Sequence, residues 1–288
     1  MRKVAFLCNP SRRWGDKFLP IQEEIKHSPG FEKEFFLVNP SQSDSTETLL
    51  NQALVKGYET IVVAAGDGTL NRALSFLGGK KLLSKITLGI LPFGTCNDFA
   101  KTMGLKRGEW KPVLESILQE KLRKFKVAKV NRHLFINNSG FGRKAPGSKK
   151  SSAFKDIQSL KPIYTKLSWD DKKLEGNFLM MVCANAPYFS DGLHFTLDSD
   201  PTDSVLEFFF VGKMNKIRLM TKLFLGKRGK PLLEKSGERA ILRINSSKLT
   251  METASPIWIM RDGEMSSDLA AIRQATFELD GDCQFLVP

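Results

Sequence analysis

Two short loops of the chain combine glycine with acidic and amide side chains, as sites that hold phosphate groups do. The first runs through Gly66, Asp67, Gly68, Thr69 and Asn71. Glycines let a backbone close around a phosphate, and a helix that begins in such a loop adds N–H donors at its positive end. The carboxylate of Asp67 is a group that could meet a metal ion or a hydroxyl. Taken alone, however, Gly-Asp-Gly is also a common turn.

The second loop has the same character and runs from Leu91 to Ala100. Within it, Thr95 and Asn97 are candidates for the residue that caps the following helix. Asp98 would lie in the first turn of that helix, where a carboxylate interacts favourably with the helix dipole. Because two Gly/Asp loops in succession are harder to attribute to ordinary turns than one, we predict that both loops belong to a phosphate-binding site.

Cysteine and histidine chemistry finds no support in the sequence. The cysteines stand roughly a quarter of the chain apart, without the close spacing of a zinc site or a redox pair; they are Cys8, Cys96, Cys183 and Cys283. We expect them to be buried structural thiols. The three histidines are equally isolated, and the motifs of metalloproteases, serine hydrolases and P-loop kinases are absent.

The charge balance indicates a polyanionic partner. The chain has 44 Lys and Arg against 31 Asp and Glu, a net charge of +13, which suits nucleotide phosphates, nucleic acid or an anionic membrane surface. The run Lys213–Lys230 is basic, contains no acidic residue and has apolar residues at helical spacing. This pattern is typical of a helix that lies on a membrane, and equally of a surface helix that packs on its own core.

Strand and helix signals alternate through the first hundred residues. Apolar runs predict strands at Val4–Cys8, Glu34–Val38, Thr60–Ala64 and Ile86–Leu91. Helical periodicity predicts helices at Phe18–Ile25, Thr46–Val55 and Leu70–Leu77. Such alternation is typical of a parallel sheet with crossover helices, whose ligand crevice lies beyond the carboxyl ends of the strands. Both Gly/Asp loops would lie at that edge.

From about Leu122 the signals become strand-like. Strands are predicted at Leu134–Asn138, Phe178–Ala184, Val205–Val211, Ala240–Ile244, Pro256–Met260 and Ala275–Leu279, and an exposed loop at Lys144 to Lys161. We therefore expect two domains, an α/β domain over 1–128 and a β-rich domain over 129–288. The last strand, at about 277–288, could return to the first domain.

The sequence favours a cytoplasmic location. The longest stretch without a charged residue is Gly176 to Ser190, which is shorter than the ~20 apolar residues of a membrane-spanning helix. The N-terminus lacks the long apolar region and cleavage site of a signal peptide.

Taken in order, the motifs resemble those of the diacylglycerol kinase catalytic domain family, which includes bacterial lipid kinases and sphingosine kinases. The resemblance rests first on Gly-Asp-Gly-Thr-x-Asn at 66–71 and Leu-Pro-x-Gly-Thr-x-Asn-Asp-Phe-Ala at 91–100. Further matches follow along nearly the whole chain, at 9–11, 140–142, 185–189, 203–207 and 262–264. So many matches in the same order are not expected by chance.

The resemblance implies an ATP- and Mg²⁺-dependent kinase that phosphorylates the hydroxyl of a lipid, either diacylglycerol or a sphingoid-like lipid. It implies a Rossmann-like three-layer α/β domain followed by a β-sandwich domain, with the nucleotide in the cleft between them. The implied partners are ATP, the lipid substrate and an anionic membrane surface that the protein contacts peripherally. Nucleic acid is not an implied partner, and a homodimer is left open.

The resemblance also assigns site residues. Glu264 matches the usual catalytic base, and Asp67 would hold the metal and phosphates, although the reverse assignment is left open. Nucleotide contacts are implied for Asn9, Ser11, Gly66, Asp67, Gly68, Thr69, Asn71, Thr95, Asn97 and Asp98. A magnesium ion is implied at Asp200, Asp203 and the backbone of Val205.

The chain departs from the family pattern at several positions. Ala65 stands where the first loop usually has glycine, and Ser204 replaces the glycine of the metal segment. Arg12–Arg13 stand where the loop after the first strand is commonly glycine-rich, and Pro40 stands where a nucleotide-contacting threonine is common. The segment between Gly142 and Leu167 is shorter than in relatives. We expect these changes to affect the first nucleotide loop and the acceptor site.

Three other functions stay open. A NAD kinase-like or sugar kinase would share the Gly-Asp-Gly loop, although the second loop and the late Asp-Gly-Glu speak against it. A catalytically silent module that binds nucleotide or lipid would fit the altered first loop and the short acceptor segment. A nucleic-acid binder would explain the net charge but not the Gly/Asp loops, and zinc-finger spacings and RNA-binding aromatic motifs are absent.

Overall fold

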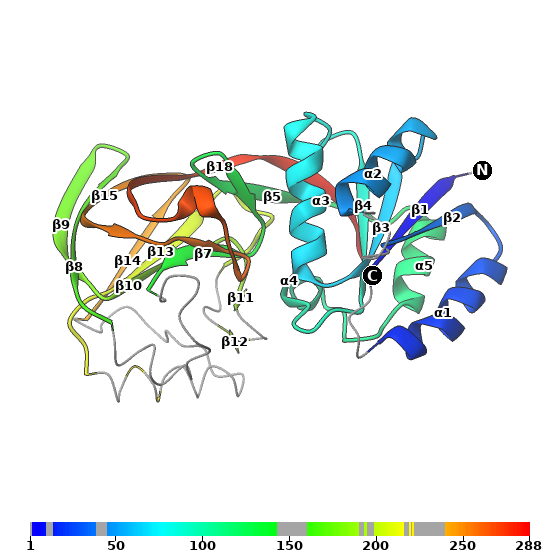
Figure 1. Ribbon diagram of the computed structural model, residues 1–288, viewed down its shortest axis with the longest axis horizontal. Helices are drawn as coiled ribbons and strands as arrows, with labels where there is room; N and C mark the ends of the chain where they lie inside the picture. The colour runs from blue at the N-terminus through cyan, green and yellow to red at the C-terminus, as the bar shows by residue number, and fades with distance from the viewer. Residues whose placement is uncertain are drawn as a thin grey trace. The chain divides into compact units, whose positions relative to one another are not determined.

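The structure is a computed structural model that describes residues 2–9, 14–38, 45–142, 160–189, 193–194, 199–215, 219, 221 and 240–288. The chain forms two compact units (Figure 1), one of Met1–Phe125 with Gly281–Pro288 and one of Lys126–Asp280. Two strands, β5 (Leu122–Val130) and β18 (Ile272–Leu286), contribute residues to both units.

The first unit is an α/β fold. Its strands are β1 (Lys3–Cys8), β2 (Glu32–Leu37), β3 (Thr60–Ala65) and β4 (Thr87–Pro92). Its helices are α1 (Gly15–His27), α2 (Thr46–Val55), α3 (Asp67–Gly79), α4 (Asp98–Thr102) and α5 (Lys111–Gln119). The strands are parallel in the order β2-β1-β3-β4, and the end of β18 adds beside β4 through Gln284 and Phe285. The predicted parallel sheet is confirmed.

Burial explains this arrangement. All six residues of β3 are buried, as are the last five of β1, because helices cover the sheet on both faces, as parallel sheets require. Helices α2 and α3 contact each other on one face, whereas the turn after α1 packs against Leu118 of α5. Helix α2 is capped by its own N-cap residue, because the hydroxyl of Ser45 accepts the backbone N–H of Thr48 at 3.1 Å.

The strand order fixes where a ligand can bind. Strands β1 and β3 are neighbours, but the chain leaves β1 towards β2 and leaves β3 towards β4. At such a switch point the two loops diverge to opposite sides, and a crevice opens at the carboxyl ends of the strands. Asn9 follows β1 and Gly66 follows β3, so the fold places two predicted site segments at this edge of the sheet.

The second unit consists mainly of two antiparallel sheets, with the orders β14-β13-β10-β7-β16-β17 and β18-β15-β8-β9; β5 and β6 extend the second. The strands are β6 (His133–Phe135), β7 (Asn138–Phe141), β8 (Ile163–Trp169), β9 (Lys172–Phe178), β10 (Met180–Ala184), β13 (Leu206–Val211), β14 (Ile241–Ser246), β15 (Lys248–Ile257), β16 (Met260–Arg261) and β17 (Glu264–Met265). A separate pair, β11 (Tyr188–Phe189) and β12 (Leu193–His194), and the 3₁₀-helix η2 (Ser267–Leu269) complete it.

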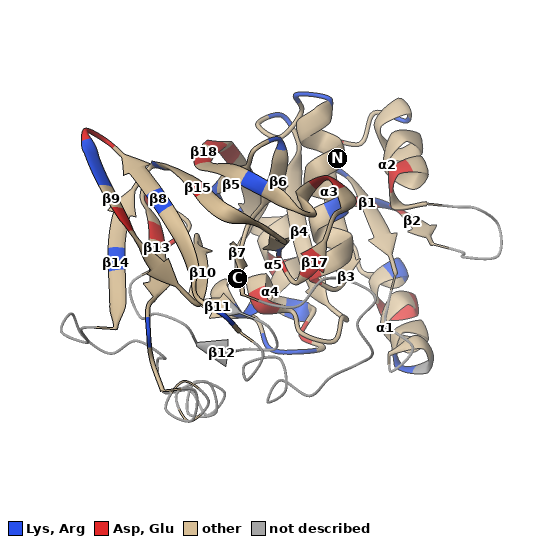
Figure 2. Ribbon diagram, turned by 60° about the vertical axis from the view of Figure 1, so that its left-hand side comes forward, with Lys and Arg blue, Asp and Glu red and all other residues tan. Residues whose placement is uncertain are grey.

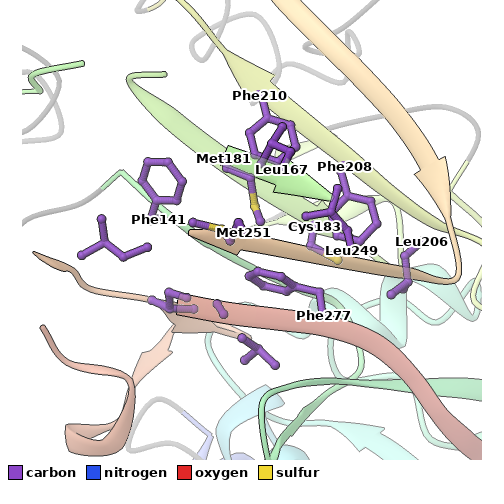
Figure 3. Close-up of a cluster of buried hydrophobic side chains, with 14 of the residues drawn as sticks. Phe141, Leu167, Met181, Cys183, Leu206, Phe208, Phe210, Leu249, Met251 and Phe277 are labelled. Atoms are coloured by element: carbon purple, nitrogen blue, oxygen red, sulfur yellow. The ribbon is translucent and has the colours of Figure 1, made fainter. Parts of the chain in front are cut away.

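An aromatic and sulfur-rich core joins the two sheets. Figure 3 shows Phe208 and Phe210 of β13 facing the same cluster as Leu249, Met251 and Phe277 of the other sheet. All five side chains are buried, and each contributes on the order of 1.5–3 kcal/mol through burial. The unit is therefore a β-sandwich, and the predicted fold class of an α/β domain followed by a β-sandwich is confirmed.

Three strand predictions differ from the structure in their details. The strand predicted at Leu134–Asn138 is interrupted at 136–137, where the backbone N–H groups bind a side chain instead of a neighbouring strand. The strand predicted at Phe178–Ala184 is broken at Leu179. The strand predicted at Pro256–Met260 ends at Ile257 and resumes as β16.

Other predictions fall wholly or partly beyond the described residues. Only residues 160 and 161 of the loop predicted at Lys144 to Lys161 are described, and only residues 213–215, 219 and 221 of the Lys213–Lys230 run. Figure 2 shows that basic and acidic residues of the described chain occur in both units. No helix in the described ranges has the length and apolarity that crossing a membrane demands.

Candidate functional site

The carboxyl ends of β1 and β3 bring two predicted nucleotide-site residues together. The side-chain amide of Asn9 donates to the hydroxyl of Thr69 at 3.2 Å, and the backbone N–H of Asn9 donates to the carbonyl of Ala64 at 3.0 Å. Thr69 is buried, whereas Asn9 is partly exposed. Asn9, the residue that follows β1, is therefore tied both to the end of β3 and to the first turn of α3. Ser11, the other predicted contact of the first loop, lies outside the described residues.

Helix α3 begins at Asp67, three residues before the start that apolar periodicity predicted at Leu70. Gly66 is the N-cap residue, and its carbonyl accepts the N–H groups of Thr69 and Leu70, both at 3.1 Å. Gly68 and Thr69 consequently lie in the first helical turn rather than in a closed glycine loop. The first N–H groups of a helix have no partner within the helix, and its N-terminus carries partial positive charge. This end of α3 has the chemistry of an anion-binding site.

Asp67 links this loop to the second one. Its Oδ1 atom accepts the backbone N–H of Phe99, in the first turn of α4, at 3.1 Å. Asn97 occupies the N-cap position of α4 but does not cap the helix with its side chain. Its amide instead accepts the N–H of Gly94 at 2.8 Å and donates to the carbonyl of Gly94 at 3.0 Å. Asn97 is therefore the N-cap residue, as one of the two predicted candidates, but the hydrogen bond that caps the helix comes from the carboxylate of Asp67 in the other loop.

The two glycine loops touch each other through their backbones. A Cβ atom on Gly66 would lie 2.9 Å from the Cα atom of Gly94, and a Cβ atom on Gly94 would overlap the backbone of Gly66. These positions require glycine because of close approach, not because of an unusual φ angle. Ala65, where the family has glycine, is the last residue of β3 and is buried in an ordinary strand. Its methyl group therefore fits.

The remaining first-unit residues have distinct surroundings. Asn71 and Asp98 are buried, and the carboxylate of Asp98 lies 3.4 Å from the ammonium group of Lys101. Thr95 is exposed, and its carbonyl accepts a hydrogen bond from the guanidinium of Arg107. Cys96 is only partly exposed, whereas the other three thiols are buried. Thr95 and Cys96 are therefore the solvent-accessible part of the second loop.

Sequence reasoning missed three residues that support these loops. The ring of Trp14, which precedes α1, packs edge-on against Phe93 with 5.4 Å between centroids. Gly108 lies against the same indole, and its φ of 80° is in the left-handed region. Arg107, next to that glycine, holds the Thr95 carbonyl. In the sequence, Gly108 was the only sign that a turn supports the second loop, and a single glycine is too common to be informative.

Glu264, the predicted base, belongs to the second unit. It is partly buried and lies on β17, opposite Arg261 of β16. The turn between these strands consists of Asp262 and Gly263, with φ angles of 45° and 82°. Two residues with positive φ are the mark of a tight type I′ hairpin.

The predicted magnesium segment folds back on itself. One oxygen of Asp200 accepts the N–H of Thr202 at 2.8 Å, and one oxygen of Asp203 accepts the N–H of Val205 at 2.8 Å. Burial raises the pKa of Asp203 above its ordinary value, and the negative charges of Asp200 and Glu207 act in the same direction, against the Val205 N–H. The segment is thus enriched in negative charge that a cation would relieve.

The described residues of this segment offer a cation few side-chain ligands. In the described ranges, no group of three or more His, Cys, Asp or Glu side chains is arranged to hold a metal ion. A magnesium ion bound at Asp203 would need backbone carbonyls and water as its other ligands, which Mg²⁺ accepts readily.

Comparison with known proteins agrees with this architecture. Residues 3–130 match the model of the diacylglycerol kinase catalytic domain, and residues 129–277 match the YegS C-terminal NAD kinase beta sandwich-like domain. The diacylglycerol kinase of Bacillus subtilis (strain 168) is 22% identical over 228 residues, which cover 74% of this chain and 73% of that protein. The diacylglycerol kinase of Staphylococcus saprophyticus subsp. saprophyticus is 23% identical over 215 residues, 69% of each chain.

A solved structure shares the fold over the whole chain. The crystal structure of a diacylglycerol kinase from Bacillus anthracis str. Sterne has a TM-score of 0.73 and 22% sequence identity, and the match covers 100% of this chain and 97% of that one. Because the two family models meet near residue 130 and together span residues 3–277, the chain belongs to the diacylglycerol kinase catalytic domain family.

Proposed function

We propose that this protein is a lipid kinase that transfers the γ-phosphoryl group of ATP to a lipid hydroxyl, with Mg²⁺ as the metal. One observation carries the proposal: Asp67 joins the N-terminus of α3 to the N-terminus of α4, beside the switch point of a parallel sheet. Phosphoryl transfer requires mainly that the phosphates be held, that their charge be neutralised and that one carboxylate orient the attacking hydroxyl. The relatives described above carry the name diacylglycerol kinase.

The first-unit loops would hold the nucleotide. The N–H groups at the start of α3 suit the phosphates, and Asn9 is positioned beside them by its bond to Thr69. Since Oδ1 of Asp67 accepts the N–H of Phe99, we assign the other carboxylate oxygen to the cation of Mg-ATP. When bound, the metal spreads the charge that develops on the phosphoryl group. Glu264 would accept the proton of the lipid hydroxyl as general base.

The acceptor and the membrane contact belong to the same proposal. Diacylglycerol is the leading acceptor because the relatives are named for it, and a sphingoid-like lipid is the alternative. The basic run Lys213–Lys230 would face anionic headgroups, where each basic residue contributes about 1 kcal/mol. Because salt screens such interactions, binding to anionic vesicles should weaken as salt increases. Equal binding to neutral and anionic vesicles would contradict the membrane contact.

Phosphate transfer to a panel of acceptors tests the proposal. The protein is incubated with radiolabelled ATP, Mg²⁺ and mixed vesicles that contain diacylglycerol, ceramide, sphingosine or phosphatidylglycerol, and in parallel with NAD. We expect label in the lipid phase for one of the lipids, and none in NAD. Label in NAD alone would support the NAD kinase-like alternative, and ATP binding without any transfer would support a catalytically silent module.

A further inference from the structure

The turn that precedes Glu264 is held by an unusual number of hydrogen bonds to one side chain. Oδ1 of Asp262 accepts the backbone N–H groups of Asn137 and Asn138 at 2.8 and 3.0 Å, and Oδ2 accepts that of Ile136 at 3.0 Å. In return, the N–H of Asp262 donates to the carbonyl of Asn138 at 2.8 Å. The carboxylate is thus bound by three consecutive peptide groups more than a hundred residues away in the sequence.

The strand that precedes the turn, β16, is tied to the same part of the sandwich by two further hydrogen bonds. The guanidinium of Arg261 donates to the carbonyl of Leu134 at 3.0 Å, and the hydroxyl of Ser139 donates to the carbonyl of Met260 at 2.8 Å. The segment that receives Asp262 is fixed in its turn, because Nδ2 of Asn185 donates to the carbonyl of Ile136 at 2.6 Å. A chain of bonds therefore runs from β6 and β7 into the hairpin that carries Glu264.

The chemistry of these contacts requires a carboxylate. An ionised carboxylate accepts at both oxygens and donates at neither, whereas an amide presents an NH₂ group at one of the two positions. An amide at residue 262 would therefore leave at least one N–H of 136–138 facing another donor. Asparagine adopts the left-handed conformation readily, so such a change would alter the hydrogen bonds without straining the turn, whose φ at this residue is 45°.

We infer that Asp262 is a positioning residue for catalysis: its carboxylate, held by the N–H groups of 136–138, sets the orientation of Glu264 on β17. The inference rests on the proposed role of Glu264 as general base. A base must be held near its productive geometry, to within about 0.5 Å, by surrounding contacts. Asp262 supplies such a contact two residues before Glu264, at the turn of a hairpin whose strands are each only two residues long.

Two matched asparagine variants test this inference. Asp170 occupies the first position of another tight hairpin turn in the same unit, between β8 and β9, with a φ of 47°. Its carboxylate accepts one hydroxyl, that of Ser246 at 3.0 Å. We expect Asp262→Asn to lower kcat about 10- to 100-fold, the loss that a misplacement of about 1 Å can cause, with KM for ATP unchanged. Asp170→Asn should leave both constants at their wild-type values.

A double-mutant cycle separates positioning from general weakening of the fold. If Asp262 acts through Glu264, Asp262→Asn should lower the residual rate of Glu264→Gln much less than it lowers the wild-type rate. Equal factors in both backgrounds, or wild-type kcat in Asp262→Asn, would overturn the inference. Wild-type activity of Glu264→Gln would instead refute the proposed base, so the two failures are distinguishable.

Hydrogen exchange gives a readout that does not depend on turnover. In Asp262→Asn the amides of 136–138 should exchange faster than in the wild-type protein, whereas in Asp170→Asn they should not change. If Asp262→Asn does not fold, Ser139→Ala is the milder variant, since it removes only the bond to the Met260 carbonyl. It should lower kcat by a smaller factor, again without raising KM for ATP, and an unchanged kcat would count against the inference.

Discussion

One oxygen of the Asp67 carboxylate accepts the N–H of Phe99, and we propose that the other oxygen binds the cation of Mg-ATP. We predict that Asp67→Ala lowers the free energy of unfolding by about 1 kcal/mol relative to Asp67→Asn, the usual cost of a lost helix cap. The reason is that an asparagine oxygen can still accept the N–H of Phe99. Both variants should lose Mg-dependent use of ATP. Urea unfolding of the two variants measures the difference, and equal stabilities would show that the bond to α4 contributes nothing.

The pH dependence of stability tests the cation site that we propose at Asp203. Burial and the charges of Asp200 and Glu207 raise the pKa of Asp203 in the folded protein above its unfolded value. The folded state then binds this proton more tightly, so the group destabilises the fold as pH rises above the ordinary aspartate range. Without metal, Asp203→Asn should therefore melt at or above the wild-type temperature at neutral pH, and the difference should vanish in acid.

Addition of Mg²⁺ should raise the melting temperature of the wild-type protein above that of Asp203→Asn. A cation that binds the folded state stabilises it by mass action, so the wild-type protein should gain melting temperature while Asp203→Asn gains little. Thermal unfolding with and without Mg²⁺ measures both effects. An equal gain in the two proteins would move the metal site away from Asp203.

At the scale of the elements, the approach of the two glycine loops makes a quantitative prediction. Gly94→Ala would drive a methyl group into the backbone of Gly66, and such overpacking costs about 1–3 kcal/mol. The matched control is Gly79→Ala at the end of α3, where nothing lies within 4 Å of the added Cβ. That change should stabilise the protein by about 0.4–1 kcal/mol. Denaturant unfolding distinguishes them, and a neutral Gly94→Ala would mean that the loops separate easily.

Local signals in the sequence predicted most elements of the first unit. The strand–loop–helix order and α2 at Thr46–Val55 were predicted from apolar periodicity alone and are confirmed. The hairpin of β8 and β9 was missed because its second strand, Lys172–Phe178, is mostly exposed and lacks an apolar alternation. Helix α5 was also missed, although it has a proline in its first turn, which is a common helix start.

The site was predictable only where its residues adjoin in the sequence. The Gly/Asp loops were visible because each lies within a few residues after a strand. The bond from Asp67 to Phe99 spans 32 residues, and those from Asp262 to Ile136–Asn138 span 124 to 126. Such contacts depend on how the strands are ordered and on which turn faces which segment. No local pattern encodes either property.

At the scale of the whole molecule, β18 contributes to the cores of both units. Phe285, near its end, packs on Phe99 and Phe125 of the first unit, with centroid distances of 5.0 and 5.5 Å. Phe277, earlier on the strand, is buried in the sandwich core beside Phe208. Because each unit has its own core, we predict that calorimetry resolves two unfolding transitions.

The two phenylalanines should then act on different transitions. A buried phenylalanine changed to alanine typically costs about 3–5 kcal/mol. Phe285→Ala should lower the melting temperature of one transition and Phe277→Ala that of the other. A single transition that both variants shift equally would show that the units unfold as one body.

We propose that Glu264 activates the lipid hydroxyl as the general base of an ATP-dependent kinase, and this claim is the central one. The most direct measurement is the rate at which labelled phosphate passes from ATP to vesicle lipid in the wild-type protein and in Glu264→Gln, together with ATP affinity by calorimetry. We predict that Glu264→Gln lowers kcat about 10²- to 10⁴-fold, the usual contribution of a general base, and leaves ATP affinity nearly unchanged. A Glu264→Gln variant that phosphorylates lipid at the wild-type rate, or that loses its activity only because ATP no longer binds, would contradict the claim.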